Sequence, residues 1–462
     1  MRTILIFAIW LAAYPCAESF SQTVSDEDPL ERYIAEGFKN NIVLQQKNIS
    51  LDRALVAFQT AKSMFLPSVV FQGNYQTADG GRNIPLPLGD LLNGAYATLN
   101  QLTGTQNFPQ LQNESITFLP KNFYDAKVRT TVPIINTDIV YNKKISEQQI
   151  HLRESEVDTY RRELVKNIKS AYYNYLNALQ AIDIYRSALD LAKEGKRVNE
   201  KLLESGKGLP AYILRSSSEI ASAGAQLTQA IQQAENAKLY FNSLLNRPGE
   251  AAIDSVFDAD KELLSSSAGL KADIDITQRD ELKSLNQVIR LNETVVKMNR
   301  NYAVPKLSGF LDLGSQSENW KFNGQSRYYL AGLQLDIPLF AGNRNQYKIS
   351  QSGLDLKDAE LNFNNIQQQL ELSGNVARNN LRSAWEVYKS SMVQMDAAST
   401  YHRLIERGYR EGTNTYIETI DARNQLTSAR IALLIHKYNV LSASAALERE
   451  TAAYNLNNKN HE

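Results

Sequence analysis

The sequence predicts a mainly α protein in which one strand-helix-helix-strand unit occurs twice. Two long heptad patterns, two glycines at matching turns and two pairs of prolines that flank strands support this fold class. Shifting the numbering by 206 residues lays the turn at Gly206 on the turn at Gly412. In both halves the residues that follow the turn alternate in steps of three and four, the a/d pattern of a coiled coil. The two seams are Ile213, Ser216, Ile220, Ala223, Leu227, Ala230, Ala234, Ala237, Phe241 and Leu244, and Thr419, Ala422, Leu426, Ala429, Leu433, His436, Val440, Ala443, Leu447 and Glu450.

The N-terminus has the features of an export signal over residues 1–21. Arg2 precedes an apolar run over residues 4–13, and Ser19-Phe20-Ser21 ahead of Gln22 gives a plausible cleavage site. A short N-terminal anchor helix remains the alternative. Cys16, the only cysteine, lies in or beside this segment, and its lipidation is left open. The 50 basic and 50 acidic residues of the 462-residue chain give no electrostatic argument for a nucleic-acid partner.

Four strands are predicted, at about 67–78, 123–133, 306–316 and 326–338. In the second of them the alternation is strict. Tyr124, Ala126 and Val128 point to one side, whereas Asp125 and Lys127 point to the other. Residues 79–121, rich in Gly, Pro and Asn, are predicted to be a long loop between the first two strands.

The strand faces predict contact with lipid on one side and water on the other, as in an outer-membrane barrel. Four strands cannot close such a barrel, for which about eight is the practical minimum. An open edge in lipid is forbidden. We therefore expect a homotrimer with a transmembrane 12-stranded β-barrel and a long α-helical coiled-coil barrel of twelve helices.

The predicted helices divide the chain into segments. A first repeat spans 22–247, with an N-terminal helix from Leu30 to about Met64 and a hairpin tip at 205–210. An equatorial segment covers 248–277. A second repeat spans 278–456, with a helix from about Gln278 to Asn301, a hairpin tip at 408–415 and a final helix that fades near Leu456. Residues 457–462 form a tail. Each descending arm is on the order of 100 Å long at about 1.5 Å per residue.

The turn Gly412-Thr413-Asn414-Thr415, followed by Glu418 and Ile420-Asp421-Ala422, resembles the tip motif of the TolC family of outer-membrane efflux proteins. The resemblance covers nearly the whole mature chain. It implies a trimer with its barrel in the outer membrane of a Gram-negative bacterium and its helices in the periplasm. The implied partners are a periplasmic adaptor, an inner-membrane pump of the resistance-nodulation-division or ABC type, and outer-membrane lipid.

The resemblance also implies roles for tip residues. Gly412 and Thr413 correspond to an adaptor-docking turn, and Gly206 and Lys207 to its first-half counterpart. Tyr409, Glu418 and Asp421 correspond to a periplasmic gate, where acidic rings narrow the entrance. The departures are Ser205 and Glu411 in place of a common valine, Lys207 in place of a small or apolar residue, and Tyr212 in place of an acid.

Three copies of Glu418 and Asp421 at a constriction would attract cations and raise carboxylate pKa values by like-charge repulsion. The alternative is a solvated acidic face in the first turns of a helix, where it stabilises the helix dipole. The four histidines show no ligand spacing and no carboxylate pair stands out as catalytic, so we predict no enzyme, cofactor or metal site.

Two functions remain. The first is an outer-membrane exit duct of a tripartite efflux or type I secretion system, which the resemblance implies. The second is a periplasmic coiled-coil adaptor or scaffold without transport activity, in which the strands form a small soluble domain.

Overall fold

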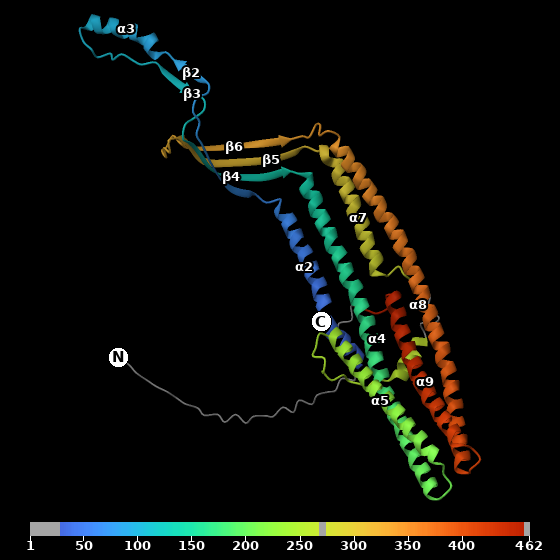
Figure 1. Cartoon of the computed structure of the whole chain (residues 1–462). Coiled ribbons are helices and arrows are strands. Elements are labelled where there is room, and N and C mark those ends of the chain that lie inside the picture. The colour runs from blue at the N-terminus through green and yellow to red at the C-terminus, as the bar shows by residue number, and fades with distance from the viewer. Residues whose placement is uncertain (1–27, 268–273, 457–462) are drawn as a thin grey trace, which may run out of the picture.

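The computed structural model describes residues 28–267 and 274–456 as an elongated molecule, with a sheet at one end and two helical hairpin turns at the other (Figure 1). The predicted signal at 1–21 with Cys16, the tail at 457–462, and residues 268–273 of the equatorial segment lie outside the described residues. The helices are α1 (Pro29–Asn40), α2 (Ile42–Ser63), α3 (Leu88–Thr103), α4 (Thr137–Glu204), α5 (Pro210–Leu244), α6 (Ala259–Ser266), α7 (Asp280–Arg300), η2 (Asn301–Ala303), α8 (Arg344–Arg410) and α9 (Tyr416–Glu450). The strands are β1 (Ser68–Gln76), β2 (Asn83–Leu86), β3 (Glu114–Thr117), β4 (Phe123–Ile135), β5 (Lys306–Glu318) and β6 (Arg327–Asp336).

Two helical hairpins of nearly equal length dominate the molecule. Helices α4 and α5 have 68 and 35 residues, and α8 and α9 have 67 and 35. Because α5 begins at Pro210 and α9 at Tyr416, the two ascending helices are offset by 206 residues. The longer arms are about 100 Å long at ~1.5 Å per residue. The repeat in the sequence is therefore a repeat in the structure, and the predicted mainly α fold class is confirmed.

The buried seam follows the heptad pattern closely in α5 and only partly in α9. In α5, Ser216, Ala223, Ala230 and Ala237 are all buried. In α9 the predicted positions Leu433 and His436 are only half-buried, and Leu434 and Tyr438 are buried instead. The reason is that α9 packs against α4 as well as α8, so a second face of the helix is covered.

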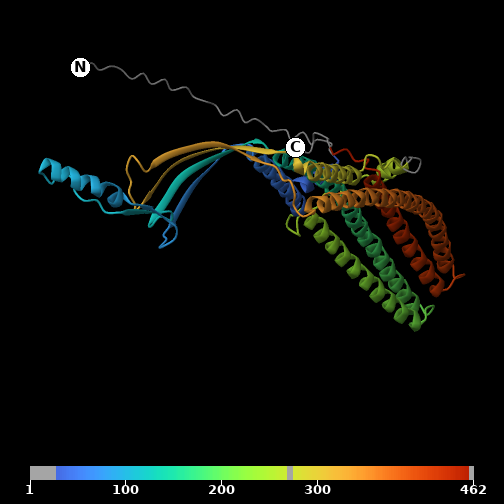
Figure 2. The same ribbon diagram turned by 90° about the horizontal axis from the view of Figure 1, so that it is seen from above.

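The main sheet is antiparallel, with strand order β1-β4-β5-β6. The helices α2, α4, α7 and α8 join it at one end, and the connections 77–122 and 319–326 lie at the other, as Figures 1 and 2 show. Within the described chain, β1 and β6 each pair on one side only. The sheet of one protomer is therefore open at both edges.

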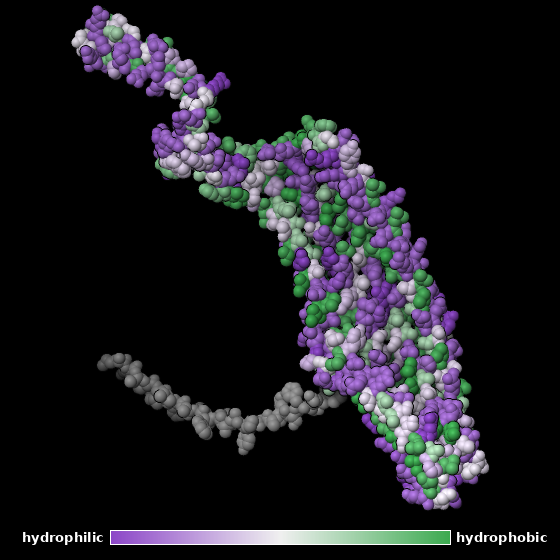
Figure 3. Space-filling model, in the orientation of Figure 1, coloured by the Kyte–Doolittle hydropathy of each residue, from purple (hydrophilic) through white to green (hydrophobic). Residues whose placement is uncertain are grey.

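The two faces of this sheet differ sharply in polarity. Phe71, Val128, Leu313 and Tyr329 stand in register across all four strands, and they are 71%, 40%, 55% and 78% exposed. On the opposite face Arg129 donates two hydrogen bonds, of 2.7 and 2.6 Å, to Asp312. Figure 3 shows hydrophobic surface over the region of the sheet and its junction with the helices. The apolar row is uncovered by the rest of the protomer, so a self-contained sandwich does not form.

The core lies at mid-height, where α1, α4 and α5 meet the segment after α5. Tyr172, Ile168, Phe241 and Ile34 are fully buried there. The ring of Phe257 stands edge-on to Tyr172 at 5.6 Å between ring centroids. This aromatic cluster joins the first hairpin to the equatorial segment.

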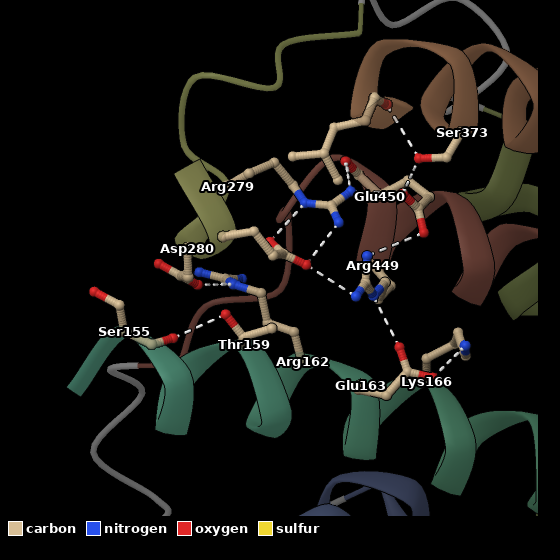
Figure 4. Close-up of polar contacts among 12 residues, drawn as sticks. Ser155, Thr159, Arg162, Glu163, Lys166, Arg279, Asp280, Ser373, Arg449 and Glu450 are labelled. Atoms are coloured by element: carbon tan, nitrogen blue, oxygen red, sulfur yellow. Dashed lines mark hydrogen bonds and ion pairs between the residues drawn. The ribbon is translucent and has the colours of Figure 1, made fainter. Parts of the chain in front are cut away.

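A buried ionic cluster ties the second half of the chain to α4 at the same height (Figure 4). Arg279, which is 1% exposed, contacts Glu450 at 2.6 Å and Glu281 at 2.8 Å. Arg449 contacts Glu281 and Glu450, and it reaches Glu163 of α4 at 2.9 Å. Burial opposes ionisation of Glu281 and Glu450, but hydrogen bonds outweigh it and lower the pKa of each carboxyl, from Arg279 to Glu281 and from Ser373 and Arg279 to Glu450. The cluster therefore holds its carboxylates ionised although they are partly buried.

The prediction of a long loop at 79–121 is wrong, because the segment contains β2, α3 and β3. Leu88, Leu92, Ala95 and Leu99 repeat in steps of four and three, which is a helical pattern. The segment was predicted to be a loop because Gly89, Gly94 and the flanking prolines are typical of turns. Helix α3 follows Pro87 directly and ends at Gly104, whose φ of 67° is left-handed.

The predicted N-terminal helix is two helices, since Asn41 interrupts it. The side chain of Asn41 accepts a 3.0 Å hydrogen bond from the Leu44 backbone N–H, which caps α2, while its own N–H bonds to Gly37. The final helix ends at Glu450 and not near Leu456, because Ala452 adopts a left-handed φ of 53°.

Among residues 28–267 and 274–456, no helix has both the length and the apolar character needed to cross a membrane.

Candidate functional site

The candidate site is the pair of hairpin tips, whose turns have the same backbone geometry. In the first, the N–H of Lys207 bonds to the carbonyl of Leu202 at 2.8 Å, and in the second Thr413 bonds to Gly408 at 2.8 Å. Gly206 and Gly412 have φ values of 71° and 78°. These are Schellman turns, which require a residue that tolerates the left-handed region. The two glycines are therefore needed for the backbone, whatever else they do.

Four predicted docking residues form the outer surface of these turns. Gly206, Lys207, Gly412 and Thr413 are all exposed. The Thr413 hydroxyl donates to the Gly408 carbonyl at 3.0 Å, which closes the second turn further. The structure thus places all four at the end of the molecule farthest from the sheet (Figure 1).

Just above the turns a buried polar cluster connects all four long helices. The Asn199 side-chain amide of α4 donates to the Ser216 hydroxyl of α5 at 3.0 Å. Ser216 in turn lies 2.8 Å from the Tyr416 hydroxyl of α9. The Tyr409 hydroxyl of α8 donates to the Asn199 side-chain oxygen at 2.7 Å. Asn199, Ser216 and Tyr416 are at most 2% exposed, so these bonds form away from water.

Tyr409, the predicted gate tyrosine, therefore binds the first hairpin within one protomer. Burial raises the pKa of its hydroxyl, so the group stays protonated and donates at neutral pH. The sequence prediction missed Asn199 and Tyr416. Asn199 gives no signal, since a lone Asn in a long helix is ordinary, but Ser216 was a polar residue at a seam position.

Tyr212 also takes part, although the family pattern has an acid there. Its ring lies 5.4 Å from the ring of Tyr416, which lies 5.8 Å from that of Tyr409. Aromatic pairs at such separations stabilise by roughly 0.5–1.5 kcal/mol beyond the area they bury. The departure at Tyr212 thus replaces a charge by packing that holds the two tips together.

Arg423 makes a second link between the hairpins. Its guanidinium donates to the backbone carbonyl of Leu191 in α4 at 3.1 Å. A Cβ at position 195 would lie 2.4 Å from the Arg423 Nη1 atom, so Gly195 leaves the space that the guanidinium fills. Sequence analysis singled out neither residue.

Glu418, one of the two predicted gate acids, is part of a helix cap. Its carboxylate accepts from the Thr415 N–H at 2.7 Å, and the Thr415 hydroxyl accepts from the Glu418 N–H at 3.3 Å. This is the capping box of α9. The backbone hydrogen bond from Thr415 lowers the pKa of Glu418. The rise expected from three like charges concerns an assembly of three chains and stays a prediction.

Asp421, the other predicted gate acid, is exposed one turn further along α9. Its carboxylate accepts from the Gln425 side-chain amide at 2.9 Å and has no role in the cap. Tyr409, Glu418 and Asp421 therefore gather on the second tip, where each bonds to other residues. In the part of the chain that the structure describes, no group of three or more His, Cys, Asp or Glu residues could hold a metal ion.

The chain is similar in sequence and in fold to outer-membrane efflux and secretion proteins. Residues 267–452 match the outer membrane efflux protein family. Over 341 residues the chain is 23% identical to the alkaline protease secretion protein AprF of Pseudomonas aeruginosa, an alignment covering 70% of this chain and 69% of AprF. Over 292 residues it is 23% identical to the probable efflux pump outer membrane protein TtgC of Pseudomonas putida, covering 62% of this chain but only 59% of TtgC.

Solved structures share the fold over almost the whole chain. The Campylobacter jejuni CmeC outer membrane channel aligns with a TM-score of 0.72 at 16% identity, covering 92% of this chain and 86% of CmeC. The outer-membrane channel OprN aligns with a TM-score of 0.72 at 16% identity, covering 93% and 91%. The duplicated hairpins, open sheet and linked tips thus define a protein with the fold of outer-membrane channels.

The comparisons confirm the predicted resemblance: residues 267–452 match the outer membrane efflux protein family, and nearly the whole chain has the fold of outer-membrane channels. Proteins of this family are channels, not enzymes, and they work as trimers with periplasmic adaptors and inner-membrane pumps. The outer-membrane location predicted from the sequence agrees with these relatives.

Proposed function

We propose that three copies of this chain form the outer-membrane exit duct of a tripartite efflux or type I secretion system. In this proposal the sheets lie in the outer membrane and the hairpins cross the periplasm. An adaptor and a pump of the resistance-nodulation-division or ABC type meet the tips. Substrates pass through without chemical change, and the energy comes from the pump. The relatives named for protease secretion and for efflux support both routes, so the cargo class stays open.

One observation carries the proposal, the uncovered apolar row on the sheet. Phe71, Val128, Leu313 and Tyr329 are exposed side by side, while the Arg129–Asp312 pair lies on the opposite face. Monomeric soluble proteins rarely expose such a contiguous apolar patch. Lipid on one face and a wet lumen on the other accounts for both faces.

The tips take two roles in this duct. Tyr409, Glu418 and Asp421 form the periplasmic gate, to which Asp421 contributes a carboxylate that takes no part in the α9 cap. Gly206, Lys207, Gly412 and Thr413 are the adaptor-docking surface. Two observations support these roles. The docking residues and both acids are exposed at or near the distal turns, and Tyr409 donates a hydrogen bond that links the two tips.

Fractionation and conductance test the duct. The protein should be found in the outer membrane as a heat-modifiable trimer and should produce discrete ion conductance in planar bilayers. The competing function is a periplasmic scaffold. Soluble monomers in the periplasmic fraction, with no conductance from the purified protein, would favour it.

The docking surface needs a substitution that spares the turn. Gly412→Trp would strain a left-handed backbone, so a loss of export could reflect misfolding. Lys207→Trp avoids this problem, because Lys207 is exposed and does not have a positive φ. We expect at least tenfold lower export with trimers intact. Lys193→Trp, on the exposed surface of α4 above the turn, is the matched control and should export normally.

A further inference from the structure

The segment between β1 and β4 projects beyond the sheet at the end opposite the hairpin tips (Figures 1 and 2). It consists of the short β2–β3 ladder and the 16-residue helix α3. Residues 77–82 and 118–122 are its only connections to the sheet. Since these links are short, α3 cannot move far from the end of the sheet.

One side of α3 is occupied by the chain that follows it. Asn93 and Leu111 exchange two hydrogen bonds of 2.9 and 2.7 Å, from the Asn93 amide to the Leu111 carbonyl and from the Leu111 N–H back to Asn93. Asn100 and Phe108 exchange two more, of 2.8 and 3.1 Å. The two asparagines are seven residues apart and therefore lie on the same face of the helix. These four bonds fix which side of α3 faces its own chain.

A second face of α3 is apolar and at least partly exposed. Leu88, Leu92, Ala95, Leu99 and Leu102 repeat in steps of four and three. Leu92, Leu99 and Leu102 in the seam are 37%, 39% and 79% exposed, and Leu91 beside the seam is 70% exposed. This is the a/d spacing by which helices pack on other helices. The helix contains a single charged residue, Asp90, and it is away from the seam, bonded to Asn113.

We propose that the α3 helices of three copies pack together along this seam and form a cap over the outer end of the duct. The inference rests on the proposed trimer. In that trimer, β1 is a sheet edge that must pair with a neighbouring copy, and β1 leads directly into the segment that carries α3. The three seams thus start from the same height and from adjacent positions around one axis.

The composition of α3 favours other copies over the membrane surface as the occupant. Helices that lie on a bilayer are typically rich in Lys and Arg on the polar face, where they contact anionic headgroups. Helix α3 has neither residue. Its polar face is instead taken by the chain's own backbone through Asn93 and Asn100.

Cysteine cross-linking of the full chain tests the cap. In a Cys16→Ser background, Ala95→Cys places a thiol in the seam, and Ala97→Cys places one on the far side of the same helix. With a short thiol-to-thiol reagent on purified trimers, we expect at least fivefold more covalent dimer from Ala95→Cys than from Ala97→Cys. Equal yields would overturn the cap. Trimer migration is checked first, so a failure to form trimers counts against the proposed function and not against the cap.

Two further measurements separate the remaining outcomes. A fluorophore attached to the Ala95→Cys variant that is quenched by nitroxide lipid, without cross-linking, would assign α3 to the membrane and overturn the proposal. The cap also predicts obstruction of the outlet. Leu92→Glu with Leu99→Glu should at least double the single-channel conductance, whereas the far-side pair Ala97→Glu with Gln101→Glu should not. Unchanged conductance in the seam variant would contradict a closed outlet.

Discussion

The Tyr409 hydroxyl of the second hairpin donates a 2.7 Å hydrogen bond to the Asn199 side chain of the first. Asn199 is 1% exposed, so removal of its donor would leave a buried oxygen unsatisfied at a cost of roughly 1–3 kcal/mol. The bond joins α8 of the second hairpin to α4 of the first, close to the two turns.

Tyr409→Phe should therefore loosen the tip and raise conductance at least twofold, with trimers still formed. Planar-bilayer recording measures the change. Tyr401→Phe removes a hydroxyl from an exposed ring two turns away on the same helix and is the control. If both variants conduct like the wild type, the bond does not restrain the entrance.

Asp421→Asn should weaken block of the channel by a multivalent cation at least threefold. The carboxylate is exposed and free of the α9 cap, so its loss removes charge without unfolding the helix. Block is measured as the half-inhibitory cation concentration. Asp396→Asn, which removes an exposed carboxylate farther from the tip, should leave the block unchanged. An unaltered block in Asp421→Asn would remove this residue from the gate.

Arg279→Leu should destabilise the protein by about 3 kcal/mol, because it leaves partly buried carboxylates with less compensation. Arg279 is 1% exposed and contacts both Glu281 and Glu450. Thermal unfolding in detergent measures the loss. Arg186→Leu breaks an exposed pair with Asp183 and should cost less than about 1 kcal/mol. Similar losses from the two variants would mean that burial of the cluster is unimportant.

The same cluster predicts a dependence on pH. The pKa values of Glu281 and Glu450 are lowered from 4.5 in the folded chain. Their contribution is thus fully present above 4.5 and is lost as the pH falls through the lower folded values. Wild-type unfolding should become easier below pH 4.5 by a larger margin than in Arg279→Leu. Parallel pH profiles for the two proteins would contradict this assignment.

Leu313→Arg should sharply lower the yield of trimers in the outer membrane. A charge on the lipid-facing side of a barrel strand costs about 2–4 kcal/mol at the bilayer midplane. Gln334→Arg, on a neighbouring strand but on the polar face, is the control and should assemble normally. Quantitative blotting of membrane fractions gives the yields. Normal assembly of Leu313→Arg would argue against lipid contact at the apolar row.

Elements that belong to the long repeat could be predicted from the sequence, whereas the short helix α3 could not. The two hairpins repeat over hundreds of residues, so Gly206 and Gly412 could be matched by a fixed offset and the fold class followed. Helix α3 has little more than two heptads between prolines and glycines, and its signal was lost among turn residues. The break at Asn41 was missed because an Asn that caps one helix is identical in sequence to an Asn within a longer one.

The tip was harder to predict than the fold. Tyr409, Glu418 and Asp421 were placed there by a resemblance, which cannot tell that Glu418 bonds to the backbone of Thr415. The contacts of Asn199 and Arg423 depend on how two hairpins some 200 residues apart settle against each other. The residues next to Asn199 and Arg423 in the sequence therefore do not predict these contacts.

The matching backbones of the two turns have a consequence for any partner at the tips. In the proposed trimer, six loops share one conformation, and the three first-half loops carry Lys207 where the three second-half loops carry Thr413. The ring of loops therefore has approximate sixfold symmetry in its backbone but only threefold symmetry in its charge. Six identical partner molecules would therefore occupy two kinds of binding site. Where a partner is held by attraction to the charge of Lys207, it would dissociate more readily when the salt concentration rises.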